Sequence, residues 1–255
     1  MKVFMITGTS RGLGEAMVKR LFSSDHHLVC ISRKKNDHLI KEAANNQTAL
    51  DYYECDLHEL HSLDALMKRI FHALSSMKID ALYLINNAGV VQPIAPAHKN
   101  TSEEIERNIH VNLIAPMILT ANFIKLAYHL KIEKRILNIS SGAGRNPYEG
   151  WSSYCAAKAG LDHFTRCVAK EQQKEAFGAR IVSLAPGIID TDMQKEIRST
   201  DQEDFTDLNK FIQYKKEGQL SQAQATANKI IDLLCSTSFG KQGHILDIRK
   251  IDRVE

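Results

Sequence analysis

The sequence predicts an α/β protein built on one doubly wound sheet of seven mostly parallel strands, with helices on both faces. Short apolar runs rich in β-branched residues recur along the 255 residues, and segments of helix length separate them. This alternation is typical of repeated strand–helix–strand units. No Pro/Gly/Ser-rich linker or solenoid repeat interrupts it, so we expect residues 1–255 to form a single domain. The apolar runs lie at residues 2–7, 27–33, 51–57, 81–89, 135–141, 180–187 and 243–248.

The first strand leads into a glycine-rich turn. Gly8, Gly12 and Gly14 let the backbone approach a pyrophosphate and let a helix N-terminus face it. Their spacing differs from G-x-G-x-x-G, and no G-K-[ST] follows, so the turn is not a P-loop. At the first strand-to-helix turn it predicts dinucleotide binding, with a plain tight connection as the alternative. The expected contacts are Gly8, Ser10, Arg11, Gly12, Leu13 and Gly14.

The end of the second strand indicates which dinucleotide is bound. NAD enzymes place an acidic residue there on the ribose 2′-hydroxyl, but this strand ends in Ser32 and Arg33. A guanidinium can hold a 2′-phosphate with two parallel hydrogen bonds, and Arg11 could close on it from the other side. We therefore expect NADP(H) as cofactor. A solvated basic loop is one alternative, and the nearby Asp37 keeps NAD open.

Tyr154 and Lys158 lie four residues apart in a predicted helix, so their side chains share one face. A ketone that accepts hydride develops alkoxide charge, which a proton donor with a pKa near the working pH stabilises best. The pKa of free tyrosine is about 10, and a neighbouring ammonium lowers it. We expect Tyr154 to be the proton donor and Lys158 to lower its pKa. A surface Tyr–Lys pair is the alternative.

Six motifs together resemble those of the classical short-chain dehydrogenases/reductases, in the same order. They are TGTSRGLG (7–14), NNAG (86–89), Asn112, ISSGAG (139–144), Tyr154-x-x-x-Lys158 and PGIIDT (186–191). Three longer stretches, at 150–160, 185–194 and 204–220, resemble the sepiapterin reductase branch, and within it most closely the bacterial benzil reductases. The resemblance implies a Rossmann-type, NADP-binding fold.

The resemblance also implies roles for residues near the tyrosine. Ser141, thirteen residues before Tyr154 at the end of the fifth strand, would hydrogen-bond the substrate carbonyl, with Ser140 as the competing assignment. Asn112 would anchor a water that leads to Lys158. From the residues alone, Asn112 is a helix-interior polar side chain bonded to backbone.

Further cofactor contacts are implied by the same resemblance. Asp56 would contact the adenine, and Asn86 the adenosine side. The NNAG stretch is otherwise a turn after the fourth strand, and Pro186-Gly187 is otherwise a loop signal. The expected contacts from these two segments are Asn86, Ala88 and Gly89, and, around the nicotinamide carboxamide, Pro186, Gly187, Ile188 and Thr191; Tyr154 and Lys158 complete the set.

Substrate contacts are predicted from less specific signals. The polar segment at about 190–218 is long for a connection and is typical of a substrate loop. Met193 and the loop around Phe205 and Phe211 could form a lid, with amphipathic helix packing as the alternative. Trp151 either walls a pocket for flat substrates or packs in the core. Asp247 interrupts an apolar strand, where a carboxylate is costly unless paired. The resemblance implies that Asp247 anchors a pterin, and a solvated strand end is the alternative.

Composition limits the classes of partner. The 33 basic and 30 acidic residues are intermixed and leave a formal charge of +3, which favours no nucleic acid. No unbroken apolar run approaches the ~18 residues of a membrane span, and MKVFMITG is too short for a signal peptide. We expect a cytoplasmic protein without a membrane partner. Five scattered cysteines predict reduced thiols, and eleven histidines without ligand spacing indicate no metal.

The sequence thus predicts NADPH-dependent reduction of a carbonyl group. The resemblance implies a small-molecule substrate, either an α-dicarbonyl such as benzil or a pterin side-chain ketone. It also implies a homodimer packed through the helices that begin near Thr101 and Gly150. The alternatives are a 3-oxoacyl-thioester reductase, a non-catalytic NADP-binding sensor and a nucleic-acid-binding module. Ser141, Tyr154 and Lys158 favour an enzyme, because a pure binding protein needs none of them.

Overall fold

The sheet follows the predicted plan. The computed structural model describes residues 1–251, and its strands run in the order β3-β2-β1-β4-β5-β6-β7 with every neighbouring pair parallel. The strands are β1 (Lys2–Thr7), β2 (His26–Ser32), β3 (Ala49–Glu54), β4 (Ala81–Asn86), β5 (Glu133–Ile139), β6 (Arg180–Ala185) and β7 (Ile245–Asp247). The fold class is therefore confirmed. The third strand ends earlier than its apolar run, so Asp56 lies in the following loop.

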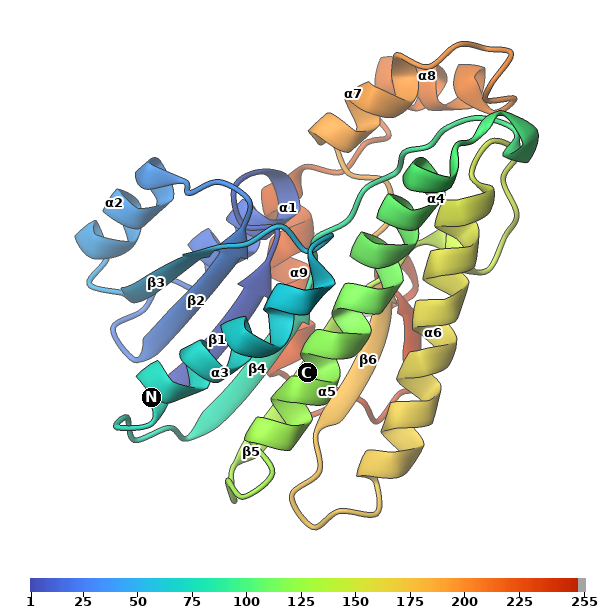
Figure 1. Ribbon diagram of the computed structural model, residues 1–255. Coiled ribbons are helices and arrows are strands. Elements are labelled where there is room, and N and C mark those ends of the chain that lie inside the picture. Colours follow the sequence, from blue (N-terminus) through green and yellow to red (C-terminus); the bar gives the residue numbers. More distant parts are fainter. Residues whose placement is uncertain (252–255) are drawn as a thin grey trace.

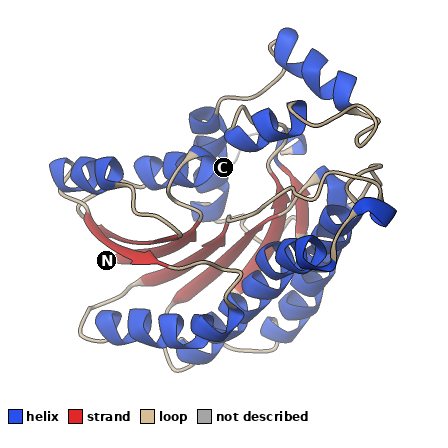
Figure 2. Cartoon of the chain, turned by 45° about the horizontal axis from the view of Figure 1, so that its top comes forward, coloured by secondary structure: helices blue, strands red, loops and turns tan. Residues whose placement is uncertain are grey.

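Helices cover both faces of the sheet (Figure 2). They are α1 (Gly12–Arg20), α2 (Asp37–Asn45), α3 (Leu63–Leu74), α4 (Ser102–Ile109), α5 (Ala115–Leu126), α6 (Ser152–Gln172), α7 (Asp192–Arg198), α8 (Leu208–Lys216) and α9 (Ala223–Cys235). In β1, Phe4 and Ile6 pack into the layer of α1 and α9, whereas Val3 and Met5 pack into the layer of α3 and α5. The two layers arise because successive strand side chains point to opposite faces.

β1 and β4 lie side by side in the sheet, and the chain leaves them in opposite directions. β1 leads to β2 on one side, and β4 leads to β5 on the other. In open α/β sheets, ligands bind at the carboxyl ends of the strands where the order reverses in this way. Here the backbone N–H of Asn87 donates to Thr7 Oγ1 at 2.9 Å, which joins the turn after β4 to the turn after β1. The glycine turn therefore faces the crevice.

The segment between β6 and α9 folds into α7 and α8, beyond the carboxyl ends of the strands (Figure 1). We call residues 190–218 the α7–α8 cover. Its side chains Phe205, Leu208 and Phe211 are buried against Trp151, and the rings of Phe205 and Trp151 stack with centroids 4.8 Å apart. The predicted substrate loop is thus a helical cover packed on the start of α6.

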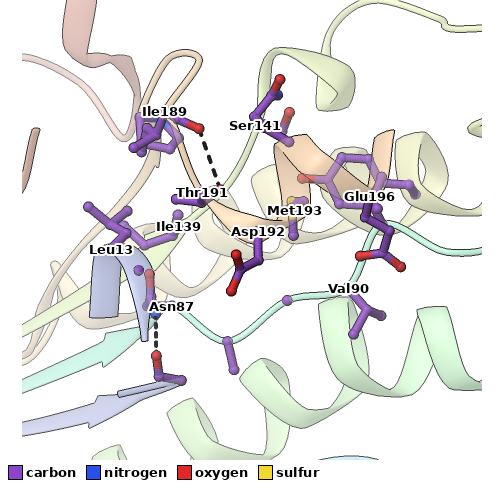
Figure 3. Close-up of a pocket in the computed structure, with 18 of the residues that line it drawn as sticks. Leu13, Asn87, Val90, Ile139, Ser141, Ile189, Thr191, Asp192, Met193 and Glu196 are labelled. Atoms are coloured by element: carbon purple, nitrogen blue, oxygen red, sulfur yellow. Dashed lines mark hydrogen bonds between the residues drawn. The ribbon is translucent and has the colours of Figure 1, made fainter. Parts of the chain in front are cut away.

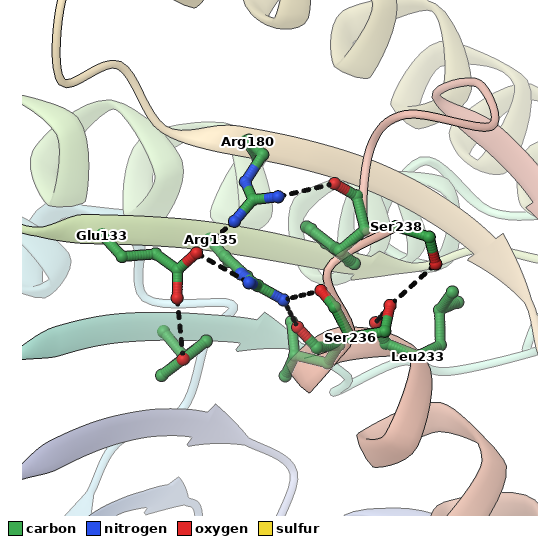
Figure 4. Close-up of polar contacts among 9 residues, drawn as sticks. Glu133, Arg135, Arg180, Leu233, Ser236 and Ser238 are labelled. Atoms are coloured by element: carbon green, nitrogen blue, oxygen red, sulfur yellow. Dashed lines mark hydrogen bonds and ion pairs between the residues drawn. The ribbon is translucent and has the colours of Figure 1, made fainter. Parts of the chain in front are cut away.

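Two arginines organise the opposite end of β5 and β6 (Figure 4). Arg135 donates to the carbonyl oxygens of Leu234 and Ser236, at 2.6 Å for the latter, and to Glu133 at 2.6 Å. Arg180 also donates to Glu133. A cation at a helix C-terminus satisfies its free carbonyls and complements its dipole. The network therefore fixes the end of α9, from which the chain proceeds to β7.

α4 and α5 form one continuous helix, Ser102–Leu126, through a π-helical turn at His110–Ile114. By length and composition this 25-residue helix is apolar enough to cross a membrane, and 39% of its apolar window is buried in the structure. Its buried side, which includes Phe123, packs in the layer with α3 and α6. The sequence shows no unbroken apolar run of this length, because polar residues such as Asn112 interrupt the helix. A core helix of a folded protein can pass the same test of length and composition.

Candidate active site

A large cavity of about 630 Å³ opens at the carboxyl ends of the strands. The glycine turn, the ends of β4, β5 and β6, the start of α6 and the α7–α8 cover form its wall (Figure 3). The predicted residues that line it are Gly8, Ser10, Arg11, Gly12, Leu13, Gly14, Ser32, Arg33, Asp56, Ala88, Gly89, Ser141, Trp151, Tyr154, Lys158, Pro186, Gly187, Ile188, Thr191 and Met193. Asn86, Asn112 and Asp247 do not line it.

The glycine turn fits the pyrophosphate of a dinucleotide. A Cβ atom on Gly14 would lie 2.1 Å from the carbonyl oxygen of Gly8, so only glycine allows α1 to start this close to β1. Arg11 is the N-cap of α1 and makes no side-chain capping bond. The first N–H groups of α1 are therefore not capped by that side chain. A helix N-terminus of this kind attracts anions through its free donors and its dipole.

Arg33 lines the cavity at the end of β2 with an exposed side chain. Asp37, the residue that left NAD as an alternative cofactor, is an exposed residue of α2 and does not line the cavity. Arg11 pairs with Asp192 at the start of α7, with Nη1 and Oδ2 3.1 Å apart. The predicted binding of a 2′-phosphate between Arg33 and Arg11 is therefore not preformed, because Arg11 forms an ion pair with Asp192 of the α7–α8 cover.

Ser32 and Asp56 are both held by neighbouring polar groups. The Ser32 and Tyr52 hydroxyls share a hydrogen bond of 2.6 Å. Partial burial acts to raise the pKa of Asp56, but the backbone N–H of His58 and the guanidinium of Arg107 outweigh it and hold the pKa below its ordinary value. Asp56 is thus a charged acceptor at the cavity wall, which suits an adenine amino group.

Ser141, Tyr154 and Lys158 meet at the cavity wall because the turn after β5 packs directly on α6. A Cβ atom on Gly144 would lie 2.9 Å from the backbone carbon and oxygen of Lys158, so glycine is required for this approach. Of the two serines considered, Ser141 is the one whose hydroxyl lies near enough to the Tyr154 phenol to lower its pKa. The Ser140 hydroxyl is buried without a partner in residues 1–251.

Burial dominates the protonation of the tyrosine and the lysine. It raises the pKa of Tyr154 to about 12, against an opposing effect of the nearby Ser141 hydroxyl. It lowers the pKa of Lys158 to about 8, against the opposing charge of Asp162. Lys158 Nζ donates to the carbonyl oxygen of Ile139 at 3.0 Å and lies 5.6 Å from the centroid of the Tyr154 ring. The pKa of Tyr154 is therefore raised rather than lowered as predicted, because burial of the phenol is the largest effect on it.

Asn112 lies in the π-helical turn and is satisfied by its neighbours. Its amide donates to the carbonyl oxygen of Val90 at 2.7 Å and to Asn108 Oδ1 at 3.0 Å, and its Oδ1 accepts from the N–H of Val90 at 3.2 Å. A Cβ atom on Gly89 would lie 3.0 Å from Asn112 Oδ1 and 3.7 Å from Lys158 Nζ. Asn112 is thus bonded to backbone, as its residue type alone indicates, and also neighbours the lysine.

Asn86 points away from the cavity. Its amide donates to Asn138 Oδ1 at 2.8 Å and to Thr120 Oγ1 at 3.2 Å, inside the layer that covers the sheet. The next residue, Asn87, lines the cavity and donates to the carbonyl oxygen of Thr7 at 2.9 Å. The side chain of Asn86 therefore does not face the cavity in which its adenosine contact was predicted, because alternate strand side chains face opposite ways.

Asp247 is paired inside the protein. Its carboxylate is buried and accepts two side-chain hydrogen bonds from Arg249, at 2.9 and 2.6 Å. This pairing supplies the compensation that a buried carboxylate needs. Arg249 is the member of the pair that lines the cavity, and contact of Asp247 with substrate stays a prediction.

Trp151 is the centre of an aromatic cluster, which we define as Tyr148, Trp151, Phe205 and Phe211. The ring centroids of Tyr148, Phe205 and Phe211 lie 5.1, 4.8 and 5.3 Å from that of Trp151. The ring of Tyr154 lies 5.7 Å away, edge-on. Trp151 packs in the core, as one predicted alternative has it, and also lines the cavity, while its contact with a flat substrate stays a prediction.

Several groups of side chains meet only in three dimensions. Four further side chains reach the cavity although no residue-level signal singled them out: Tyr148, Lys210, Tyr214 and Arg249. Lys210 and Tyr214 lie in the stretch 204–220, whose resemblance gives no role to either residue. Two clusters bring potential metal-ligand atoms within 4.8 Å of one another: His58, Glu106 and His110, and Glu15, His38 and Glu42. Each combines one pair spaced i, i+4 with a third residue distant in sequence, which local spacing does not reveal.

Residues 2–202 match the family model described as short chain dehydrogenase. The match includes the glycine turn, Ser141, Tyr154 and Lys158. The chain belongs to the short-chain dehydrogenase/reductase family. The family assignment that the motifs predicted is therefore confirmed.

Full-length relatives narrow the class of reaction. The benzil reductase ((S)-benzoin forming) of Bacillus cereus is 43% identical over 248 residues, covering 97% of this chain and 99% of the relative. The protein of that name from Bacillus subtilis is 34% identical over 250 residues, covering 98% and 99%. Sepiapterin reductase of Meriones unguiculatus is 28% identical over 253 residues, covering 95% of each. This short-chain dehydrogenase/reductase is an oxidoreductase of the CH–OH/C=O class, a carbonyl reductase.

Solved structures agree with the fold and the cofactor class. The KRED1-Pglu enzyme superposes with a TM-score of 0.82 at 26% identity, covering 96% of this chain and all of that one. A metagenomic short-chain oxidoreductase in complex with NADP has a TM-score of 0.73 at 25% identity, covering 96% and 94%. Together with the uncapped helix at the glycine turn, these similarities indicate a nicotinamide cofactor.

Proposed function

We propose that this protein is an NADPH-dependent reductase that converts one ketone of an α-dicarbonyl, or of a pterin side chain, to an alcohol. The observation that carries the proposal is the meeting of Ser141, Tyr154 and Lys158 in the same cavity as the glycine turn. The substrate class is inferred from the relatives, which are named benzil reductase and sepiapterin reductase.

Each member of the triad has one role in the proposed reaction. NADPH, when bound, supplies hydride to the carbonyl carbon. Ser141 donates a hydrogen bond to the carbonyl oxygen, and Tyr154 transfers its phenolic proton to that oxygen, so that the ketone becomes an alcohol. Lys158 stabilises the phenolate that remains and then returns a proton to it. With a pKa of about 8, Lys158 can give and regain that proton near neutral pH.

The raised pKa of Tyr154 fits this role in the direction of reduction. The phenol keeps its proton at neutral pH, so the donor is loaded before the reaction starts. Its anionic form develops only as the proton leaves, and Lys158 acts on that developing charge. An interaction that strengthens in the transition state accelerates the step more than one already made in the ground state.

Preference for NADPH is proposed on the charge at the end of β2. The Arg33 side chain is exposed at the cavity wall, where a planar guanidinium suits a phosphate. Nicotinamide contacts are proposed for Pro186, Gly187, Ile188 and Thr191, which line the same cavity as Tyr154 and the glycine turn. The remaining cavity beside the aromatic cluster suits a flat substrate.

We propose a homodimer that uses the continuous helix Ser102–Leu126 and α6. Apolar side chains of this helix that the chain itself leaves uncovered support the proposal, including Ile105, which is 39% exposed. One chain has a mass of 28.7 kDa, and sedimentation velocity is expected to give twice that value. A cytoplasmic location and a single-domain organisation remain predictions from the sequence.

Parallel assays of three substrate classes test the proposed function. Benzil, sepiapterin and a 3-oxoacyl thioester are each offered with NADPH and with NADH. Cofactor consumption is followed by the absorbance of the reduced nicotinamide at about 340 nm. We expect turnover with NADPH and benzil or sepiapterin, and its loss in Tyr154→Phe. Tyr128→Phe, which alters a tyrosine 60% exposed on the surface, is the matched control. Preference for the thioester, or binding of NADPH with no turnover of any ketone, overturns the proposal.

A further inference from the structure

Arg249 presents a guanidinium edge to the cavity that the proposed reaction does not use. It lies in the short 3₁₀ turn Ile248–Lys250, directly after β7. Asp247 accepts from its Nε at 2.9 Å, from its Nη2 at 2.6 Å and from its backbone N–H at 3.0 Å. The Asp247 side chain is 6% exposed, whereas that of Arg249 is 60% exposed. The buried carboxylate of Asp247 thus holds the guanidinium of Arg249, which is exposed and lines the cavity.

Donors remain on the outward edge of the guanidinium. An arginine side chain has five N–H donors, and Asp247 engages one on Nε and one on Nη2. Within residues 1–251, Nη1 makes no hydrogen bond. Because Asp247 fixes the plane of the guanidinium, the donors of Nη1 are oriented before any ligand arrives. Preorganised donors bind an acceptor at a smaller entropy cost.

The stem of Arg249 places this edge in the part of the cavity proposed for substrate. A Cβ atom on Gly187 would lie 3.5 and 3.6 Å from its Cδ and Cγ, so the stem lies over the loop proposed to hold the nicotinamide. The phenols of Tyr148 and Tyr214 lie near enough to act on its charge. Tyr148 packs on Trp151, which packs edge-on against Tyr154.

We propose that Arg249 donates a hydrogen bond to the second carbonyl oxygen of an α-dicarbonyl while the first carbonyl is reduced at Ser141 and Tyr154. This inference rests on the proposed function and adds a specificity residue to it. The site thereby selects dicarbonyls over simple ketones of the same shape. Asp247 acts as a positioning residue that orients the guanidinium and does not itself touch substrate.

Charge balance at the pair favours a neutral acceptor. Asp247 and Arg249 together carry no net charge, and Asp247 already takes two of the side-chain donors. A carboxylate would gain less from a neutralised pair than from a free cation, whereas a carbonyl needs only the directed N–H. A diketone therefore fits this site better than a 2-oxo acid.

Two matched substrates test the proposal. Benzil and deoxybenzoin share both phenyl rings, but deoxybenzoin has a methylene in place of the second carbonyl. A hydrogen bond from a charged donor predicts that Arg249→Met lowers kcat/KM for benzil by about 10- to 100-fold. The same variant is expected to change kcat/KM for deoxybenzoin by less than about twofold. Equal losses for both substrates, or no loss for benzil, overturn the assignment.

Binding gives a second readout that does not depend on turnover. Trp151 is the only tryptophan and lines the cavity, so quenching of its fluorescence by benzil reports a Kd in the presence of NADP⁺. The Kd for benzil is expected to rise in Arg249→Met and that for deoxybenzoin to stay constant. Arg249→Lys, which keeps the charge and loses the planar fork, is expected to fall between wild type and Arg249→Met, and thermal melting confirms that both variants fold.

The role of Asp247 is tested in the same assays. Asp247→Asn is expected to lower kcat/KM and raise the Kd for benzil but not for deoxybenzoin. It is expected to have no further effect when combined with Arg249→Met. An additional loss in the double variant would mean that Asp247 contacts substrate and would overturn its positioning role. Benzoylformate is the matching 2-oxo acid. If Arg249→Met lowers kcat/KM more for benzoylformate than for benzil, the choice of a neutral acceptor is overturned. If wild-type protein reduces neither ketone, the proposed function fails, while the fluorescence titrations still decide whether Arg249 recognises the second carbonyl.

Discussion

Replacing Lys158 by methionine is expected to stabilise the fold and to remove most activity. Methionine keeps the length of the side chain and removes its charge. Burial lowers the pKa of Lys158 from 10.5 to about 8, which corresponds to a cost on the order of 3 kcal/mol for holding the ammonium inside the protein at pH 7. Loss of the hydrogen bond to the carbonyl oxygen of Ile139 offsets about 1–2 kcal/mol of this. The free energy of unfolding of Lys158→Met should therefore exceed that of wild type by about 1–2 kcal/mol at pH 7.

The pH dependence of this difference gives a sharper test. The pKa of Lys158 is lower in the folded than in the unfolded chain, so the unfolded chain binds more protons between about pH 8 and 10.5. Wild-type stability therefore gains on the order of 3 kcal/mol from this group as the pH rises through that window. Lys158→Met lacks this gain, so its advantage at pH 7 should shrink and then reverse.

Urea unfolding at pH 7 and at pH 10, paired with NADPH consumption, measures both effects. Turnover is expected to fall by about 100-fold or more, because general acid catalysis loses its supporting charge. Lys170→Met, an exposed lysine on the same helix, is the control and should change stability by less than about 0.5 kcal/mol. A less stable Lys158→Met at pH 7, or a stability difference that does not vary with pH, would refute the reasoning.

Three further predictions follow from the same geometry. The kcat/KM for ketone reduction should fall above about pH 8, as Lys158 loses its proton; a profile that stays flat to pH 10 would speak against a role for that proton. Arg33→Ala should raise the KM for NADPH by about 10- to 100-fold and leave that for NADH nearly unchanged, and equal changes would exclude a 2′-phosphate contact. Gly144→Ala should lower the free energy of unfolding by about 1–3 kcal/mol, because its Cβ atom would lie 2.9 Å from the backbone of Lys158; an unchanged urea midpoint would show that the approach is looser.

The sheet and the main part of the site could be predicted because both follow from chain order. Parallel strands bring their carboxyl ends to one edge, so motifs that follow different strands meet there. Ser141 after β5 and Gly8 after β1 reach the same cavity for this reason. The position of Tyr154 relative to Lys158 follows from the helical repeat.

Side-chain partners and burial could not be predicted in the same way. Arg11 is tied to Asp192, which lies 181 residues away, and no local pattern encodes that pair. Asp247 finds its partner two residues away, but a strand pattern alone does not show which member of the pair faces the cavity. The pKa of Tyr154 depends on how completely α6 is covered, and this depends on the packing of the whole layer.

Proton donation by Tyr154 is tested most directly by the single-turnover rate of Tyr154→Phe. In this variant only the phenolic oxygen is removed, and NADPH affinity, measured by titration, should stay within about threefold of wild type. With saturating NADPH and benzil, the rate of hydride transfer is expected to fall by about 100-fold or more. A Tyr154→Phe variant that binds NADPH and reduces benzil at the wild-type rate would contradict the account.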